Sequence, residues 1–136
     1  MALRKNAKMR LLKRVPLFSG CSTRDLEEIA KIADELDFRE GKVLTKEGAA
    51  GREFFVIVEG TAEATQGRKK LRTMSDGDFF GEISLITRLP RTATVTTISP
   101  LRALVVTDRS FRRLLEDDQA IRRKVLGALG ERLEVP

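Results

Sequence analysis

The feature of this sequence that most constrains its fold is a series of short strand-forming runs between residues 43 and 106, with glycines at the turns between them. Each run is three to six residues long and is bounded by a turn signal. The predicted strands cover residues 43–45, 54–58, 61–65, 71–74, 92–97 and 101–106. No helical pattern alternates with these runs, which argues against a parallel α/β sheet. We therefore predict a mainly β fold, an antiparallel β-roll of the jelly-roll type with flanking helices.

Helical patterns lie on both sides of the strand region. Ser22 followed three residues later by Asp25 is a capping-box pattern, and the apolar spacing after it predicts a helix over about residues 23–34. Beyond the strands, Asp108 and Asp118 can each cap a helix, so we expect C-terminal helices within residues 108–134.

The chain of 136 residues suits one domain, formed by residues 15–136 and preceded by a basic arm or leading helix at residues 1–14. Six of the 26 Lys and Arg residues lie in this first segment, which contains no acidic residue, so the other 20 balance the 20 Asp and Glu residues. A basic arm could contact nucleic acid, an acidic partner or anionic lipid. Leu and Met residues alternate with the charges, and we favour an amphipathic helix packed on the domain, with nucleic acid not an expected partner.

Composition argues against several classes of site. The chain has no His, Tyr or Trp and one Cys, so a His-based metal site is impossible and few general bases are available. We expect no metal, no cofactor and no enzymatic activity. Cys21 has no partner for an internal disulfide, and no apolar run is long enough to span a bilayer or form a secretion signal. These features predict a cytoplasmic protein without a membrane span.

Residues 79–97, with the sequence FFGEISLITRLPRTATVTT, contain the parts of an anion site. Gly81 permits a tight turn, and the residues after it can begin a short helix that ends before Pro90. The free N–H groups of its first turn and the guanidinium of Arg91 would both favour a phosphate. Glu82 would repel a phosphate but could accept a hydrogen bond from a sugar hydroxyl. A phosphate beside a free ribose hydroxyl suggests a 3′,5′-cyclic nucleotide, although Glu82 and Arg91 could also be a solvated surface pair.

The runs FGEISL and PRTATV in this segment resemble the phosphate-binding cassette of the cyclic nucleotide-binding domain family, which includes kinase regulatory subunits, gated channels and catabolite-activator-like regulators. The resemblance implies that Glu82 binds the ribose 2′-OH and that Arg91 binds the exocyclic phosphate oxygens. It also implies phosphate contacts from the backbone around Ile83, Ser84 and Ala93. The whole set of implied ligand-binding residues is Gly81, Glu82, Ile83, Ser84, Arg91, Thr92 and Ala93.

Base preference and base cover are less constrained by the resemblance. Thr92 stands where a hydroxyl in some relatives contacts guanine, but bacterial cAMP binders also carry Ser or Thr there, so cAMP and cGMP both stay open, with cAMP favoured. In the family, the C-terminal helices move when nucleotide binds and a residue often covers the base. Val125, Leu129 or Leu133 could be that lid, or they could be only the apolar stripe that docks the last helix.

The run EGAAGREFFVIVEG at residues 47–60 resembles a second signature of the family, with one departure. Many relatives have an acidic residue where Arg52 stands, and that acid orients the phosphate-binding arginine. Here Glu53 or another acid would have to support Arg91, or the arginine is held less firmly. The departure leaves an alternative function, a protein-interaction module that keeps the fold but binds no ligand.

No output module follows within the 136 residues. We expect either a free-standing sensor or a sensor domain cut from a longer protein. A protein effector or a homodimer is the candidate partner besides the nucleotide.

Overall fold

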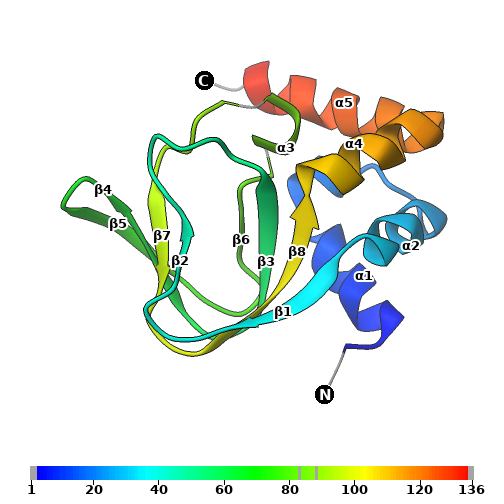
Figure 1. The fold of residues 1–136 in the computed structure, drawn as a ribbon. Coiled ribbons are helices and arrows are strands. Elements are labelled where there is room, and N and C mark those ends of the chain that lie inside the picture. Colours follow the sequence, from blue (N-terminus) through cyan, green and yellow to red (C-terminus); the bar gives the residue numbers. More distant parts are fainter. Residues whose placement is uncertain (1–2, 83, 88, 135–136) are drawn as a thin grey trace.

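The computed structural model describes residues 3–82, 84–87 and 89–134, and for residues 84 and 131–134 it describes the backbone alone. Within these residues eight strands form two four-stranded sheets, in which every pair of neighbouring strands is antiparallel (Figure 1). The first sheet has the order β1-β8-β3-β6 and the second has the order β2-β7-β4-β5. The predicted antiparallel β-roll is confirmed.

The strands of the first sheet are β1 (Asp34–Phe38), β8 (Leu101–Thr107), β3 (Glu53–Glu59) and β6 (Phe79–Phe80). Those of the second sheet are β2 (Val43–Thr45), β7 (Thr94–Thr97), β4 (Ala62–Gln66) and β5 (Lys69–Met74). Strands distant in the sequence lie side by side, since β1 pairs with β8 and β2 pairs with β7. The two sheets therefore close over each other, and the segments between 79 and 97 connect one sheet with the other (Figure 1).

The longer helices gather at one end of the roll (Figure 1). On the N-terminal side they are α1 (Lys5–Lys13), the 3-10 turn η1 (Pro16–Phe18) and α2 (Thr23–Lys31), and on the C-terminal side α4 (Asp108–Asp117) and α5 (Gln119–Glu134). The short helix α3 (Ser84–Thr87) lies in the segment that links β6 to β7. Among the described residues, no helix combines the length and the apolar character needed to cross a membrane.

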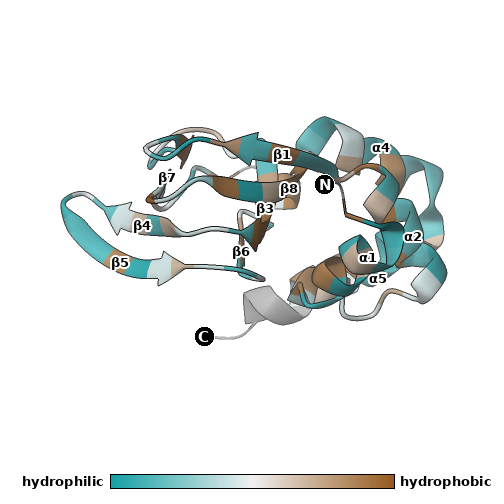
Figure 2. Cartoon of the chain, turned by 90° about the horizontal axis from the view of Figure 1, so that it is seen from below, coloured by the Kyte–Doolittle hydropathy of each residue, from teal (hydrophilic) through white to brown (hydrophobic). Residues whose placement is uncertain are grey.

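Strand β3 separates two apolar cores. Phe54 and Val56 belong to the core shared with the helices, whereas Phe55 and Ile57 belong to the core inside the roll, and all four side chains are buried. This alternation follows from the period of two along a strand. Figure 2 shows the apolar segments on β3 and β8 and in the helices beside them. A strand buried on both faces fixes the helical layer and the roll to each other.

The basic segment at the N-terminus is folded onto the domain. Leu12 of α1 is fully buried, and Lys5 forms an ion pair with Glu27 at 2.9 Å. Lys8 donates a hydrogen bond from Nζ to the carbonyl oxygen of Ala33 at 3.0 Å. Residues 5–13 therefore form a helix packed on the domain and not a free basic arm. Lys5 contacts α2, and Lys8 contacts the backbone just after it.

The capping box at α2 is confirmed, but the predicted end of the helix is wrong. The Ser22 hydroxyl accepts from the Asp25 amide at 3.1 Å, and the Asp25 carboxylate accepts from the Ser22 amide at 2.9 Å. The helix ends at Lys31, and strand β1 begins at Asp34, where the sequence predicted helix. Pairing with β8, in which Asp34 lies opposite Val105, outweighs the low strand propensity of this acidic segment.

The C-terminal caps differ by one residue from the prediction at α4 and agree with it at α5. Thr107, not Asp108, is the N-cap of α4, and its hydroxyl accepts from the Ser110 amide at 3.2 Å. Asp108 is instead the first helical residue and pairs with Arg112 at 3.0 Å. Asp118 caps α5 as predicted, because its Oδ1 accepts from the amides at positions 120 and 121 at 3.1 Å.

Candidate functional site

A cavity of about 240 Å³ opens between the second sheet, β6 and the segment around α3. Its walls include five of the residues that the sequence singled out: Gly81, Glu82, Arg91, Thr92 and Ala93. Six further residues complete the lining: Thr45, Phe80, Thr87, Leu89, Pro90 and Val95. One contiguous segment, residues 80–95, thus supplies most of the cavity, and Thr45 comes from β2.

The Arg91 side chain lies directly over the turn at Gly81. Its Nη1 donates to the Gly81 carbonyl oxygen at 3.3 Å, and its Nη2 donates to the carbonyl oxygen of Glu53. Gly81 has a φ of 90°, a left-handed conformation that favours glycine. A Cβ atom at this position would lie 2.8 Å from the Glu53 carbonyl oxygen and would overlap the guanidinium. Gly81 is therefore required both for the turn and for the position of Arg91.

The backbone of Arg91 is held by residues 47–60, the glycine-rich segment that forms the second signature. The Gly48 amide donates to the Arg91 carbonyl oxygen at 2.8 Å, and the Arg91 amide donates to the Ala49 carbonyl oxygen at 2.9 Å. The adjoining residues Ala50 and Pro90 form an isolated antiparallel bridge. The two sequence signatures, about 40 residues apart in the chain, thus meet at this one arginine.

The residues after Arg91 are fixed by side chains from neighbouring strands. The Thr45 hydroxyl, on β2, donates to the Ala93 carbonyl oxygen at 3.3 Å. The Gln66 amide group, at the end of β4, donates to the Thr92 carbonyl oxygen at 3.1 Å. These contacts fix the backbone of the cavity wall at Thr92 and Ala93. The Thr92 side chain is exposed and takes no part in them.

Two opposite charges are buried at the cavity. Arg91 is 9% exposed and Glu82 is 6% exposed. Burial lowers the pKa of the Arg91 guanidinium, and the nearby carboxylates of Glu53 and Glu82 oppose that shift. A guanidinium stays protonated at neutral pH even so. The cavity therefore presents a fixed positive charge and a carboxylate on the same short segment.

Arg52 takes no part in holding Arg91 through its side chain, which is exposed. Its backbone carbonyl oxygen accepts from the Asp108 amide at 2.8 Å and joins the end of the second signature to α4. Support for Arg91 comes instead from the next residue, Glu53, through its backbone carbonyl. The sequence left open whether Glu53, another acid or no acid supports Arg91, and the bond to Arg91 is made by the Glu53 backbone and not by its carboxylate.

The remaining site predictions fall outside the cavity or outside the described part of the chain. Ile83 lies outside the described residues, and Ser84 begins α3 with a side chain that is not described. Val125 and Leu129, the candidate base lids, are buried in the core beneath α5 and do not line the cavity. The side chain of Leu133 is also outside the described part. In this arrangement Val125 and Leu129 act as the stripe that docks the helix.

Several site residues were missed by the sequence reasoning. Thr45, Phe80 and Val95 form part of the lining, and Gln66 holds the wall from outside. Thr45 and Gln66 contribute through strand neighbours far away in the sequence, and no local pattern signals such a contact. Phe80 belongs to an adjacent pair of phenylalanines before Gly81 and stacks on Phe55 with ring centroids 4.8 Å apart.

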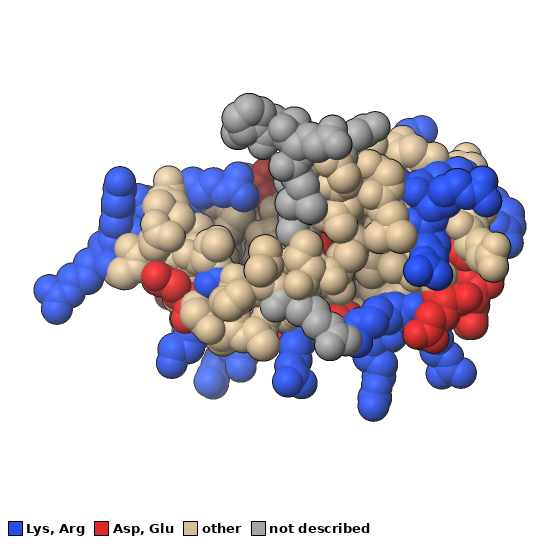
Figure 3. All heavy atoms as spheres, turned by 90° about the horizontal axis from the view of Figure 1, so that it is seen from above, with Lys and Arg blue, Asp and Glu red and all other residues tan. Residues whose placement is uncertain are grey.

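Charge is distributed unevenly over the face that is seen from above. Figure 3 shows Lys and Arg side chains projecting from the end of the molecule that carries β4 and β5, and mixed basic and acidic side chains over the helical end. The exposed basic residues of the first group are Arg68, Lys69, Lys70 and Arg72. Within the part of the chain that is described, no group of three or more Cys, Asp and Glu side chains could hold a metal ion.

Comparisons with known proteins find similar sequences over most of the chain. The family model of the cyclic nucleotide-binding domain matches residues 35–118. Over 118 residues the chain is 40% identical to a cAMP-dependent protein kinase regulatory subunit of Mycosarcoma maydis, a match that covers 78% of this chain and 22% of that protein. Over 127 residues it is 37% identical to the cGMP-dependent protein kinase, isozyme 1, of Drosophila melanogaster, covering 85% of this chain and 16% of that protein.

A solved structure has the same fold along nearly the whole chain. It is the N-terminal domain of a transcriptional regulator from Streptomyces coelicolor A3(2), with a TM-score of 0.82 and 26% sequence identity. The match covers 90% of this chain and 91% of that one. The kinase relatives, in contrast, are much longer, and this chain spans about a fifth of their length.

Proposed function

Since the chain belongs to the cyclic nucleotide-binding domain family, we propose that it binds a 3′,5′-cyclic nucleotide and acts as a regulatory sensor. The observation that carries this proposal is the meeting of Glu82, Arg91, Thr92 and Ala93 around one cavity, with the arginine clamped by the second glycine-rich segment. We propose cAMP as the preferred ligand, because the relative with the higher identity is cAMP-dependent by name, while the other is cGMP-dependent. The activity requires no covalent chemistry.

Arg91 is proposed to bind the exocyclic phosphate oxygens. A guanidinium carries five N–H donors, and two carbonyl contacts engage only part of that capacity. A phosphate is a stronger acceptor for a guanidinium than a neutral carbonyl is, because both partners are charged. The backbone around Ile83, Ser84 and Ala93 is proposed to complete the phosphate site.

Glu82 is proposed to accept a hydrogen bond from the ribose 2′-OH. Its carboxylate is buried at the cavity, where a hydroxyl donor can reach it without water competing on every side. The cavity is smaller than the usual ligand pocket of about 300–1,000 Å³, so a nucleotide would have to widen it or stay partly exposed. Widening would displace the wall formed by α3 and the residues after it.

Movement of that wall would reach the C-terminal helices. Leu85 of α3 is 1% exposed and belongs to the same core as Phe111 of α4 and Val125 of α5. A tightly packed core transmits a shift of one side chain to its neighbours. We propose that nucleotide binding repositions α4 and α5, and that Val125, Leu129 or Leu133 then covers the base.

The test is thermal unfolding of nucleotide-free protein with cAMP, cGMP or 5′-AMP. A ligand at about a hundred times its dissociation constant stabilises the folded state by roughly 2.7 kcal/mol, which raises Tm by several degrees. We expect a rise with a cyclic nucleotide and none with 5′-AMP, which lacks the cyclic phosphate. No rise with any of the three would reject the proposal and favour a ligand-free interaction module.

A further inference from the structure

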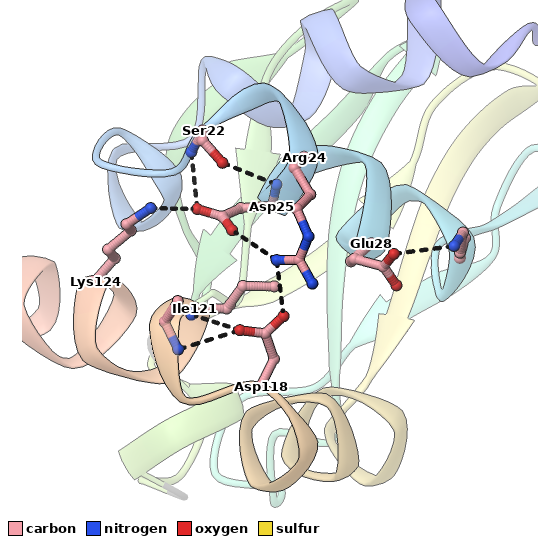
Figure 4. A network of polar contacts seen from close by, with 9 residues as sticks. Ser22, Arg24, Asp25, Glu28, Asp118, Ile121 and Lys124 are labelled. Carbon is pink, nitrogen blue, oxygen red and sulfur yellow. Dashed lines mark hydrogen bonds and ion pairs between the residues drawn. The ribbon is translucent and has the colours of Figure 1, made fainter.

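A buried carboxylate joins the N-terminal and C-terminal helices at a distance from the cavity. Asp25 in the first turn of α2 is 1% exposed, and its Oδ2 accepts two hydrogen bonds. One comes from the Ser22 amide at 2.9 Å, and the other comes from Nζ of Lys124, on α5, at 2.6 Å (Figure 4). The same oxygen therefore completes the cap of α2 and holds α5.

A second, weaker pair lies beside it. Arg24 contacts Asp118 at 3.4 Å and the other oxygen of Asp25 at 3.7 Å (Figure 4). Asp118 is also the residue that caps α5, so the starts of both helices belong to one network. The Arg24 side chain is 70% exposed, and exposed ion pairs contribute little. The contact between Asp25 and Lys124 is the one that decides the strength of the network.

This contact exists only while α5 is docked. The capping box of α2 needs an acceptor at position 25 but not a charge, because a neutral side-chain amide oxygen at N3 also accepts from the N-cap amide. Burial would raise the pKa of Asp25, but the hydrogen bonds from Lys124 and Ser22 outweigh it and hold the pKa below its usual value. The charge on Asp25 is thus stabilised by a residue of α5, and any arrangement that moves Lys124 away loses that stabilisation.

We propose that Asp25 and Lys124 form a latch that holds α5 against α2 in the nucleotide-free arrangement, and that the strength of this latch sets the apparent affinity for nucleotide. The part of this proposal that concerns nucleotide affinity rests on the proposed function. If the binding-competent arrangement has α5 displaced, apparent affinity falls by the fraction of molecules in that arrangement. A weaker latch raises that fraction and tightens binding.

Cys21 lies beside the latch, and the reactivity of its thiol can report whether α5 is docked. It is the single cysteine of the chain and is 7% exposed. Its pKa is raised to about 11, chiefly by burial and by the charge of Asp25, and Lys124 opposes that rise. A thiol reagent reacts with the thiolate, so docked protein should be modified slowly. The neighbouring residue lies against α5, since a Cβ at Gly20 would be 4.0 Å from the Lys124 Cβ. Departure of α5 should therefore expose the thiol and remove part of the burial that raises its pKa.

The first measurement is the rate of Cys21 modification by a thiol reagent in nucleotide-free protein. We expect Lys124→Met to react at least about tenfold faster than the wild type. Loss of the Lys124 charge alone would raise the Cys21 pKa and slow the reaction, so electrostatics cannot mimic the expected result. The matched control is Lys31→Met, which removes an exposed lysine of α2 paired with Glu28 and should react at the wild-type rate.

Global unfolding must be separated from release of α5. Amide exchange of β3 and β8, measured in the same samples, reports global opening and should change much less than Cys21 modification. If Lys124→Met does not fold, Lys124→Gln replaces it, because this variant leaves the capping box of α2 intact, loses the charge and, like Lys124→Met, would raise the Cys21 pKa if electrostatics alone acted. If Cys21 in the folded Lys124 variant is modified at the wild-type rate, the latch proposal is wrong.

The second measurement is nucleotide affinity by titration calorimetry. We expect Lys124→Met to bind the cyclic nucleotide at least about fivefold more tightly than the wild type, within the usual range of allosteric coupling. Faster Cys21 modification without a change in affinity would overturn the coupling to nucleotide and leave the docking role. If the wild type binds no cyclic nucleotide, the proposed function fails, whereas Cys21 modification still decides whether the latch holds α5.

Discussion

The cavity contains a buried cation, Arg91, near the buried carboxylate of Glu82, and the helical end contains a buried anion, Asp25. Arg91 and Asp25 form different kinds of hydrogen bond. Arg91 at the cavity bonds to the backbone carbonyls of Gly81 and Glu53. Asp25 at the helical end bonds to the ammonium group of Lys124 and to a backbone amide. Carbonyl groups offer dipoles, whereas an ammonium group offers a full opposite charge at 2.6 Å.

Because of this difference, the charge at the cavity can still bind a ligand, whereas the charge at the helical end is already paired within the protein. A buried cation that bonds to dipoles still attracts an anion strongly, since the low dielectric of the interior strengthens the attraction. A buried anion that is already paired with a cation would be stabilised little further by a bound ligand. Loss of Arg91 should therefore weaken ligand binding, whereas loss of Asp25 should lower stability and, through the latch, tighten ligand binding.

The largest effect is expected for Arg91→Ala. Removal of the charge-assisted hydrogen bonds to the phosphate should weaken cyclic nucleotide binding by about 1.5–3 kcal/mol, or roughly tenfold to a hundredfold. The free energy of unfolding without nucleotide should change by less than about 1 kcal/mol, because the desolvation cost of the guanidinium is removed and water from the cavity can bond to the carbonyl oxygens of Gly81 and Glu53. Calorimetric titration and urea unfolding measure the two quantities. Arg113→Ala, which removes an exposed arginine of α4, is the control.

The next effect is expected for Asp25→Ala. Breaking a buried ion pair costs about 3–5 kcal/mol, but the Lys124 side chain is 37% exposed and can regain water, so we expect a loss of about 2 kcal/mol in unfolding free energy. Urea denaturation measures it. Glu28→Ala breaks the exposed pair with Lys31 and should cost under about 0.5 kcal/mol. Equal losses in the two variants would show that the buried pair has no special role.

Acid should weaken the helical end through the same carboxylate. The pKa of Asp25 lies below its usual 3.8 in the folded protein, so the unfolded chain binds the proton first as the pH falls. This contribution to stability is complete above pH 3.8 and is lost as the pH falls through the lowered folded-state pKa. Unfolding free energy measured against pH should fall less steeply in Asp25→Asn. Glu27 and Asp37, whose pKa values are also lowered, titrate in both proteins, so the difference between the curves isolates Asp25.

The smallest effect is expected for Glu53→Gln. Arg91 bonds to the backbone carbonyl of Glu53, and the exposed carboxylate acts on it only through space. Nucleotide affinity should change by less than about threefold, since exposed charges are well screened. A loss of tenfold or more would show that the carboxylate orients the arginine, and the contrast between the two buried charges would then be weaker than the contacts indicate.

Sequence reasoning identified the parts of the site that are local in the chain. Gly81, the short helix after it and Arg91 indicated an anion site from the residues themselves, and the family resemblance added Thr92 and Ala93 in the same segment. It did not identify Thr45 or Gln66, because their contacts depend on which strands become neighbours. For Asp25 it found the cap and missed Lys124, which lies 99 residues further along the chain.

The fold was predictable to a similar extent and for the same reason. Runs with β-branched or aromatic residues and glycine turns indicated six of the strands. Strand β1, with the sequence DELDF, carries three acidic residues and forms because β8 pairs with it. Strand β6 has only two residues and is defined by its pairing with β3. Both are products of tertiary structure that local propensity does not contain.

The double burial of β3 determines how the molecule melts. Phe54 is packed edge-on against Phe18 of η1, and Phe55 on the opposite face is stacked on Phe80 beside the cavity. Neither the helical layer nor the roll can open without exposing one face of this strand to water. Heat should therefore unfold both parts in a single cooperative transition, with equal calorimetric and van 't Hoff enthalpies.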